Sequence, residues 1–139
     1  MATMTKFYQF AEDISNKVHN LGSDTLKIML TNSAPVVTNT VKADITEIAA
    51  GNGYSAGGTQ TVQTSCVQTL GVLKLVSGDV VFTASGGTIG PFRYIVLYNS
   101  TPVAGPLIAF ADYGSSITLN DGESFTVDFS ATNGVLTVT

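Results

Sequence analysis

The clearest catalytic pattern in the sequence is Gly53-Tyr54-Ser55-Ala56-Gly57, which matches the G-x-S-x-G elbow that presents the nucleophilic serine of many hydrolases. Such an elbow needs a sharp strand-to-helix turn and a histidine that follows the catalytic acid in the chain. Here glycine and threonine follow the motif, and the single histidine, His19, precedes it. The sequence therefore favours a glycine loop over 51–58, with a serine hydrolase acting through Ser55 as the enzyme alternative.

His19 and Cys66 are the other side chains that could act as a base, a nucleophile or a metal ligand. Zinc sites need several histidines or cysteines, and this chain has one of each. No basic residue lies close to Cys66 in sequence to lower its pKa, which predicts a thiol that packs as a small apolar group. His19 is expected at a helix C-terminus, where a positive charge suits the helix dipole.

Three carboxylates, Asp121, Glu123 and Asp128, could supply oxygen ligands to calcium, but their spacing does not match an EF-hand loop. Asp121 is better explained as part of a hairpin turn. The glycine-rich stretches 51–58 and 86–90 lack the Gly-Lys-Ser/Thr of a phosphate-binding loop. We therefore predict no catalytic residue, no cofactor and no metal site.

Charge is scarce in this chain. Only 12% of residues are Asp, Glu, Lys or Arg, and the net charge is −4. The few basic residues are scattered, which argues against partners that present phosphate, either nucleic acid or a membrane surface. The sequence also lacks the apolar run of a transmembrane helix and the pattern of a signal peptide, so synthesis in the cytoplasm is expected. A surface so poor in charge suits burial against another chain.

The elements that would position these residues are mainly β. Apolar spacing of three and four predicts a helix over 5–20 with Gly22 just beyond its end, and Asp44 to Glu47 resembles a capping box for a turn over 45–50. Alternation predicts a strand over 26–31. Further strands are expected at 59–65, 67–76, 79–84, 91–99, 106–111, 115–119, 123–130 and 135–139.

The expected fold is a single domain over 1–139, an antiparallel β-sandwich similar to a jelly roll with a short N-terminal helix. The segment 92–98 is apolar on both faces, which predicts a central strand covered on two sides. The dipeptides Asp121-Gly122 and Asn133-Gly134 predict hairpin turns, so the last strands are expected to form a meander.

Residues 1–22 are interpreted as a helical arm on a β core that spans 23–139. Aromatic residues suit interface centres, and five are candidate contact residues. These are Phe7, Tyr8, Phe10, Tyr54 and Tyr113.

Four segments carry a family resemblance. They are FYQFAEDISNKVHNLGSDTLKIMLTNSAP (7–35), TNTVKADITEIAAGNGYSAGG (38–58), FTASGGTIGPFRYIVLYN (82–99) and DYGSSITLNDGESFTVDF (112–129). Together they resemble a family of small virion proteins of tailed bacteriophages and prophages, whose members look like capsid decoration, or cement, proteins, while some are labelled tail-fibre proteins.

The resemblance implies a non-enzymatic protein on the capsid surface of a virion, made in the cytoplasm of a bacterial host. Its partner would be the major capsid protein, bound across subunit junctions, and self-association as a trimer or dimer would match the local symmetry of a shell. The alternative is a tail-fibre or receptor-binding module that uses Tyr54, Tyr98 or Tyr113 on glycans.

Overall fold

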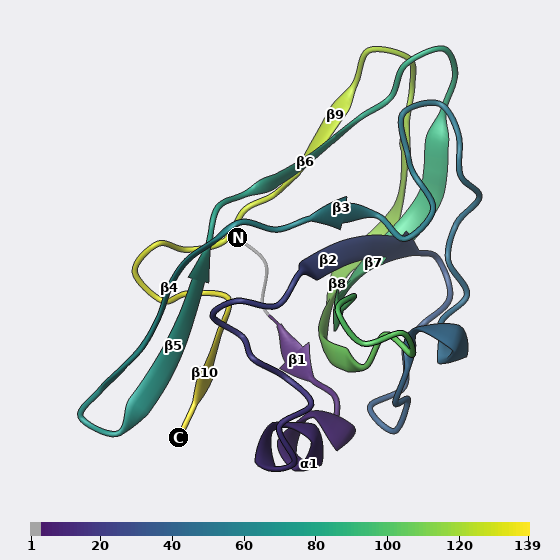
Figure 1. Cartoon of the computed structure of the whole chain (residues 1–139). Helices are drawn as coiled ribbons and strands as arrows, with labels where there is room; N and C mark the ends of the chain where they lie inside the picture. Colours follow the sequence, from purple (N-terminus) through teal and green to yellow (C-terminus); the bar gives the residue numbers. More distant parts are fainter. Residues whose placement is uncertain (1–3) are drawn as a thin grey trace.

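The computed structural model describes residues 4–139, which form antiparallel β-sheets and one short helix near the N-terminus (Figure 1). The N-terminal elements are β1 (Thr5–Lys6), α1 (Gln9–Ser15), β2 (Leu26–Thr31) and the 3-10 turn Lys42–Asp44. The central elements are β3 (Thr59–Gln60), β4 (Gln63–Thr69), β5 (Val72–Ser77) and β6 (Val80–Thr83). The C-terminal elements are β7 (Ile89–Asn99), β8 (Leu107–Leu119), β9 (Ser124–Val127) and β10 (Leu136–Val138). The predicted fold class is confirmed.

β7 is the middle strand of the larger sheet, whose order is β1-β8-β7-β2-β3. It pairs antiparallel with both β8 and β2. Its side chains alternate between two apolar clusters, since Ile95 and Leu97 enter one while Val96 and Tyr98 enter the other. The prediction of a central strand covered on both faces is therefore confirmed, and burial on two sides explains its nearly continuous apolar sequence.

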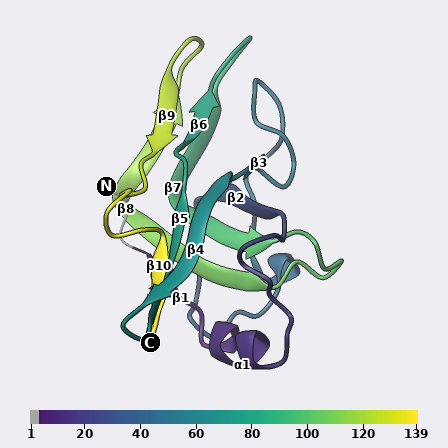
Figure 2. The ribbon, with the colours of Figure 1, turned by 60° about the vertical axis from the view of Figure 1, so that its left-hand side comes forward.

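Two smaller sheets, β10-β5-β4 and β6-β9, form the second layer. β5 leads into β6 and β9 leads into β10, so the two small sheets follow one another along the molecule (Figures 1 and 2). Leu75, Phe82 and Val127 from this layer are fully buried in the main core together with Phe92 and Ile95 of β7. Apolar side chains between two antiparallel layers give the packing of a β-sandwich.

The N-terminal segment differs from the predicted helix over 5–20. Thr5 and Lys6 pair with β8, and α1 begins only at Gln9. The helix ends early because Lys17 adopts φ 62°, and the amides of Lys17 and Val18 close the last turn on the carbonyls of Ile14 and Asp13. This is a Schellman closure with lysine in the position where Gly22 was expected.

Residues 4–22, the described part of the segment interpreted as a helical arm, pack against the rest of the domain, and residues 1–3 lie outside the described part of the chain. Phe7, Phe10 and Leu21 are buried and belong to the two apolar clusters. The ring of Phe7 lies 5.0 Å from that of Phe110 in β8. This segment therefore contributes to the core of the domain.

The predicted C-terminal meander is wrong. Gly122 and Gly134 do adopt positive φ, although Asp121 and Asn133 do not, so the expected two-residue turns are not formed. β9 pairs with β6, which sets Phe125 against Phe82, and β10 pairs with β5, which sets Leu136 against Leu75. The partners come from distant segments because these pairs bury apolar side chains in the core between the layers.

Two boundaries also differ from expectation. The chain over 45–50 is not helical, because the Asp44 carboxylate accepts hydrogen bonds from the amides of Thr40 and Val41 and so completes the turn before it. The segments 106–111 and 115–119 belong to one continuous strand, β8. Within residues 4–139, no helix is long and apolar enough to cross a membrane.

Candidate functional site

Most of the aromatic residues predicted to contact a partner lie inside the domain. Phe7, Phe10 and Tyr54 are buried, so the prediction that they form a contact surface is wrong. Tyr113 is half-buried and packs edge-on against Phe125, with a ring separation of 4.9 Å. Only Tyr8, which is 69% exposed, presents its side chain to solvent. The positions of these aromatic residues in the sequence could not show which are buried and which are exposed, because an aromatic side chain is common both in cores and in interfaces.

The buried side chain of Tyr54 holds the glycine loop 51–58 in place through hydrogen bonds. Its hydroxyl donates to Oε2 of Glu47 at 2.5 Å and accepts from the amide of Leu30 at 3.0 Å. The amide of Gly57 donates to the same Glu47 oxygen at 2.6 Å, and the hydroxyl of Tyr98 donates to the Gly57 carbonyl at 2.6 Å. Burial and the neighbouring carboxylate raise the pKa of Tyr54, so its hydroxyl stays neutral. This network fixes the loop, and Glu47 has this role rather than that of a helix cap.

Ser55 and His19 do not form the hydrogen-bonded pair that the serine hydrolase alternative would need. The chain after Gly57 leads into the short strand β3 and not into a helix. His19 lies elsewhere, with its Nδ1 3.1 Å from Nδ2 of Asn99 and its Nε2 3.9 Å from Oδ2 of Asp13. Ser55 is not among the hydrogen-bond or ion-pair partners of His19.

His19 and Asn99 form a buried polar pair. Nδ2 of Asn99 also donates to Asp24 at 2.6 Å, so Nδ1 of His19 is assigned as an acceptor and Nε2 carries the hydrogen. Nε2 is buried and has no hydrogen-bond partner among the described residues. Burial lowers the pKa of His19, while Asp13 and Asp24 oppose the shift. α1 ends at Ser15, so the predicted contact of His19 with the helix dipole is wrong.

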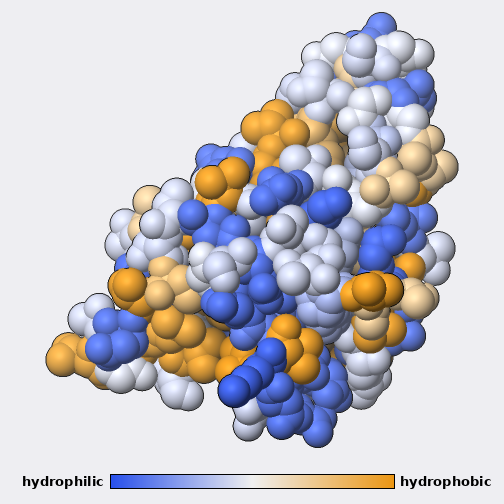
Figure 3. All heavy atoms as spheres, in the orientation of Figure 1, coloured by the Kyte–Doolittle hydropathy of each residue, from blue (hydrophilic) through white to orange (hydrophobic). Residues whose placement is uncertain are grey.

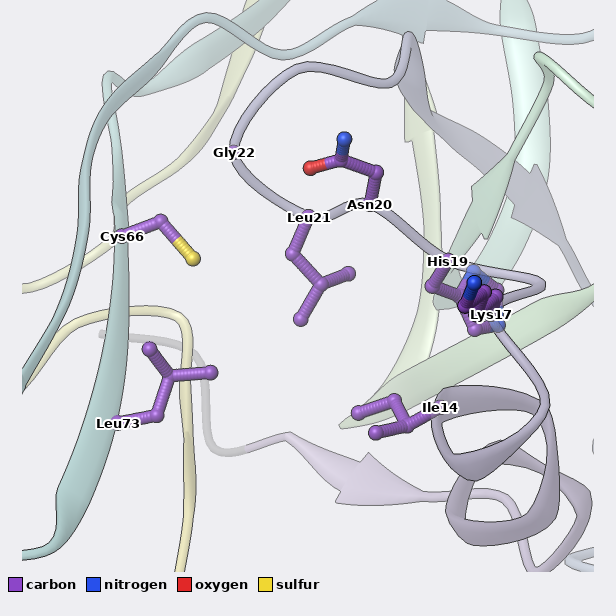
Figure 4. A pocket seen from close by; sticks show the side chains of 8 residues that line it. All are labelled: Ile14, Lys17, His19, Asn20, Leu21, Gly22, Cys66 and Leu73. Carbon is purple, nitrogen blue, oxygen red and sulfur yellow. The ribbon is translucent and has the colours of Figure 1, made fainter.

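An open apolar cleft lies between the end of α1 and the β4–β5 strands. Its volume is about 500 Å³. Ile14 and Leu21 face Cys66 and Leu73 across it (Figure 4). Burial raises the pKa of the Cys66 thiol, so the thiol stays protonated at neutral pH, and its side chain packs against the core as expected. Lys17, His19 and Asn20 also line the cleft, so its wall is partly polar, and the protonated Cys66 thiol supplies no thiolate to it.

The three C-terminal carboxylates are occupied by backbone contacts or lie apart. Asp121 accepts from the amide of Gly86 at 3.0 Å, and Glu123 accepts from that of Asn120 at 2.7 Å. Within residues 4–139, no three His, Cys, Asp or Glu side chains gather in a way that could hold a metal ion.

The two glycine-rich stretches, 51–58 and 86–90, contact each other, since the side-chain amide of Asn52 donates to the carbonyl of Thr88 at 2.9 Å.

The strongest candidate site is the β4–β5 hairpin, residues 63–77. It extends away from the body of the protein, and apolar side chains cover much of the lobe it forms at the lower left (Figures 1 and 3). Val67 is 59% exposed on β4, and Leu70 is 98% exposed at the tip. Charged residues are absent from 48–73, and the charge beside this segment in the hairpin is Lys74, which lies opposite Val67 on β5.

Leu70 is unfavourable in the isolated chain because its apolar side chain is exposed to water and because its backbone has a positive φ. Leu70 and Gly71 have φ values of 53° and 83°, which correspond to a two-residue type I′ turn. A residue with a Cβ atom in this left-handed region costs about 1–2 kcal/mol, and Asn or Gly is preferred there. Strain at an exposed apolar position is a reason to look for function.

Sequence reasoning divided this hairpin at the wrong place. Strands were expected at 59–65 and 67–76, whereas the turn is at Leu70-Gly71. Leu-Gly is not a usual turn dipeptide, so the boundary gave no local signal. The available signal was the charge-free run over 48–73.

Two of the three tyrosines in the glycan-binding alternative, Tyr54 and Tyr98, are buried and cannot stack on a sugar in this conformation. No protein-family model, curated protein or solved structure matches this chain.

Proposed function

We propose that this protein is a non-enzymatic structural component of a bacteriophage particle, a cement protein that binds the outside of the capsid across junctions of the major capsid protein. The tip of the β4–β5 hairpin makes the contact. The observation that carries this proposal is Leu70, which is 98% exposed, apolar and held in a left-handed conformation at the end of a projecting hairpin whose only charged residue is Lys74.

The energetics favour a buried partner for this tip. Burying a leucine side chain fully contributes about 1.5–3 kcal/mol. That gain offsets the cost of the left-handed backbone only when another surface covers the residue. Many copies on one shell add such small gains without repulsion between charges at the contact, because the hairpin tip has none.

Leu70→Asn separates this role from folding. Asn-Gly is the preferred type I′ dipeptide, so the variant keeps the turn and its melting temperature stays the same or rises. Loss of the apolar contact is expected to weaken capsid binding by roughly ten- to a hundredfold per site. Val103→Asn is the matched control, since Val103 is also a fully exposed apolar residue but lies in the β7–β8 loop.

The assay is co-sedimentation with capsid shells assembled without this protein. Wild-type protein and Val103→Asn should saturate the shells, and Leu70→Asn should not. Equal binding by Leu70→Asn would refute the hairpin tip as the contact. Failure of the wild-type protein to bind the shells would refute the capsid role itself.

A further inference from the structure

β4 leaves one edge of its sheet open. The sheet order is β10-β5-β4, and β4 is the outermost strand (Figure 1). Thr69 and Val72 flank the two-residue turn, so their backbones form a hydrogen-bonded pair. Bonded and non-bonded pairs alternate along an antiparallel ladder, so Cys66 and Leu75, three positions further on, are opposite each other without mutual hydrogen bonds. The Leu75 carbonyl confirms this, because it accepts from the amide of Val135 on the β10 side.

It follows that the amides and carbonyls of Cys66 and Gln68 point away from β5, towards the open edge. Among residues 4–139, no backbone group from another element bonds to them. An open row of this kind is a template for another strand.

This edge lacks the features that protect other edges. β1 and β3 have 2 residues each and β10 has 3, whereas β4 has 7. β4 contains no charged residue and no proline. Its one irregularity lies at the start, between Gln63 and Ser65, so the strand from 65 to 69 is regular. Short length, lysine, proline and bulges are the usual protections, and the outer half of β4 has none of them.

We infer that a second copy of this chain pairs with β4, antiparallel and about a two-fold axis. Antiparallel pairing of a strand with itself is symmetric, so one contact serves both chains. The protein carries a net charge of −4, which opposes self-association through most of its surface, but β4 itself has no charged residue, and Lys74, opposite Val67, lies one strand further from the pairing edge on β5. The pairing joins two three-stranded sheets into one.

One register uses the outward groups of both Cys66 and Gln68 and stays within the regular part of the strand. Cys66 of each copy pairs with Gln68 of the other, and about four hydrogen bonds form between the backbones. Val67 then lies on the axis opposite its own counterpart, in a non-bonded pair with Cα atoms about 4.5 Å apart. Its side chain, 59% exposed in one chain, gains a β-branched neighbour.

The dimer presents its two hairpin tips at opposite ends of the joined strands, about 20 Å apart at 3.3 Å per residue. Two tips at this spacing can contact two subunits of a shell. Only this consequence rests on the proposed function, because the pairing itself depends on β4 alone.

Disulfide trapping tests the register. In full-length protein with Cys66→Ser, Val67→Cys places two thiols across the axis, within the Cα range of about 4.4–6.8 Å that a disulfide tolerates. Val81→Cys in the same background is the control, since Val81 is 52% exposed on β6. With copper phenanthroline as oxidant, Val67→Cys should give a covalent dimer and Val81→Cys should not. Equal yields from the two variants would overturn the pairing.

Sedimentation equilibrium without capsids tests the association itself. Wild-type protein and Val81→Lys should dimerise, while Val67→Lys sets two like charges opposite each other and should weaken the dimer at least about tenfold. Circular dichroism checks that each variant folds. A monomeric wild-type protein at all concentrations would overturn the inference, whereas loss of capsid binding alone would leave it intact.

Discussion

Acidification should destabilise this protein through a single buried imidazole. His19 is the only histidine of the chain, and its ring lies against Phe10 with centroids 5.3 Å apart. Burial lowers its pKa from 6.5, and the attraction of Asp13 and Asp24 does not reverse the shift.

The sign follows from proton linkage. Between the lowered folded pKa and the unfolded value, the unfolded chain binds a proton that the folded chain does not, so the free energy of unfolding falls as the pH falls. The slope reaches at most about 1.4 kcal/mol per pH unit. Between pH 6.5 and 5.5 the loss is up to about 1 kcal/mol, or a melting temperature lower by about 2–4 °C.

Other groups lie outside this window. The pKa of Asp112 is lowered by Arg93, which binds it through two nitrogens at 2.8 and 3.1 Å, and by the amide of Gly114. The pKa of Asp44 is lowered by the amides of Thr40 and Val41. A carboxylate whose pKa is lowered by folding stabilises the folded protein at pH values above its ordinary pKa of 3.8. This contribution to the free energy of unfolding is lost only as the pH falls below that value.

Urea unfolding at pH 7.5 and 5.5 measures the effect, with His19→Asn as the comparison. Asn retains an acceptor near the position of Nδ1 for the contact with Asn99, but it does not titrate. The variant should be less stable at both pH values and should lose the difference between them. An equal pH dependence in the two proteins, or a wild-type protein that gains stability on acidification, would refute the reasoning.

Three further predictions concern the folded core and can be checked by urea or thermal unfolding. Tyr54→Phe should lower the free energy of unfolding by about 1–3 kcal/mol, because the Leu30 amide and the Glu47 carboxylate lose a buried partner; a change below about 0.5 kcal/mol would contradict this. Gly58→Ala should prevent folding, since its Cβ would lie 1.8 Å from the Ile28 carbonyl, whereas Gly71→Ala, with the same left-handed φ and open space, should cost only about 1–2 kcal/mol; equal effects would argue against the close approach. Removal of residues 1–22 takes Phe7, Phe10 and Leu21 from the core and should abolish cooperative unfolding, and a sharp thermal transition in the truncated protein would be inconsistent with that role.

Local patterns predicted the elements of the chain better than their partners. Period-two alternation over 26–31 and the two-sided apolar run at 92–98 fixed two core strands, because burial acts on each residue wherever its partner lies. Of the dipeptides Asp121-Gly122 and Asn133-Gly134, only the glycines adopt the expected positive φ, because glycine alone has no Cβ to oppose it. They did not determine which strands pair.

The candidate site was only partly visible before folding. The lack of charge over 48–73 marked a surface suited to burial, but five aromatic residues were equally compatible with a core or a contact. Tertiary packing placed Phe7, Phe10 and Tyr54 inside and left Leu70 outside.

The sequence by itself determined the mainly β content, the positive φ of two turn glycines and the scarcity of charge, since each depends on a residue and its near neighbours. Only the tertiary structure decided that β9 and β10 join β6 and β5, and that β4 has a free edge. Pairing between distant strands depends on how much apolar surface the whole chain can bury at once, and no short segment contains that information.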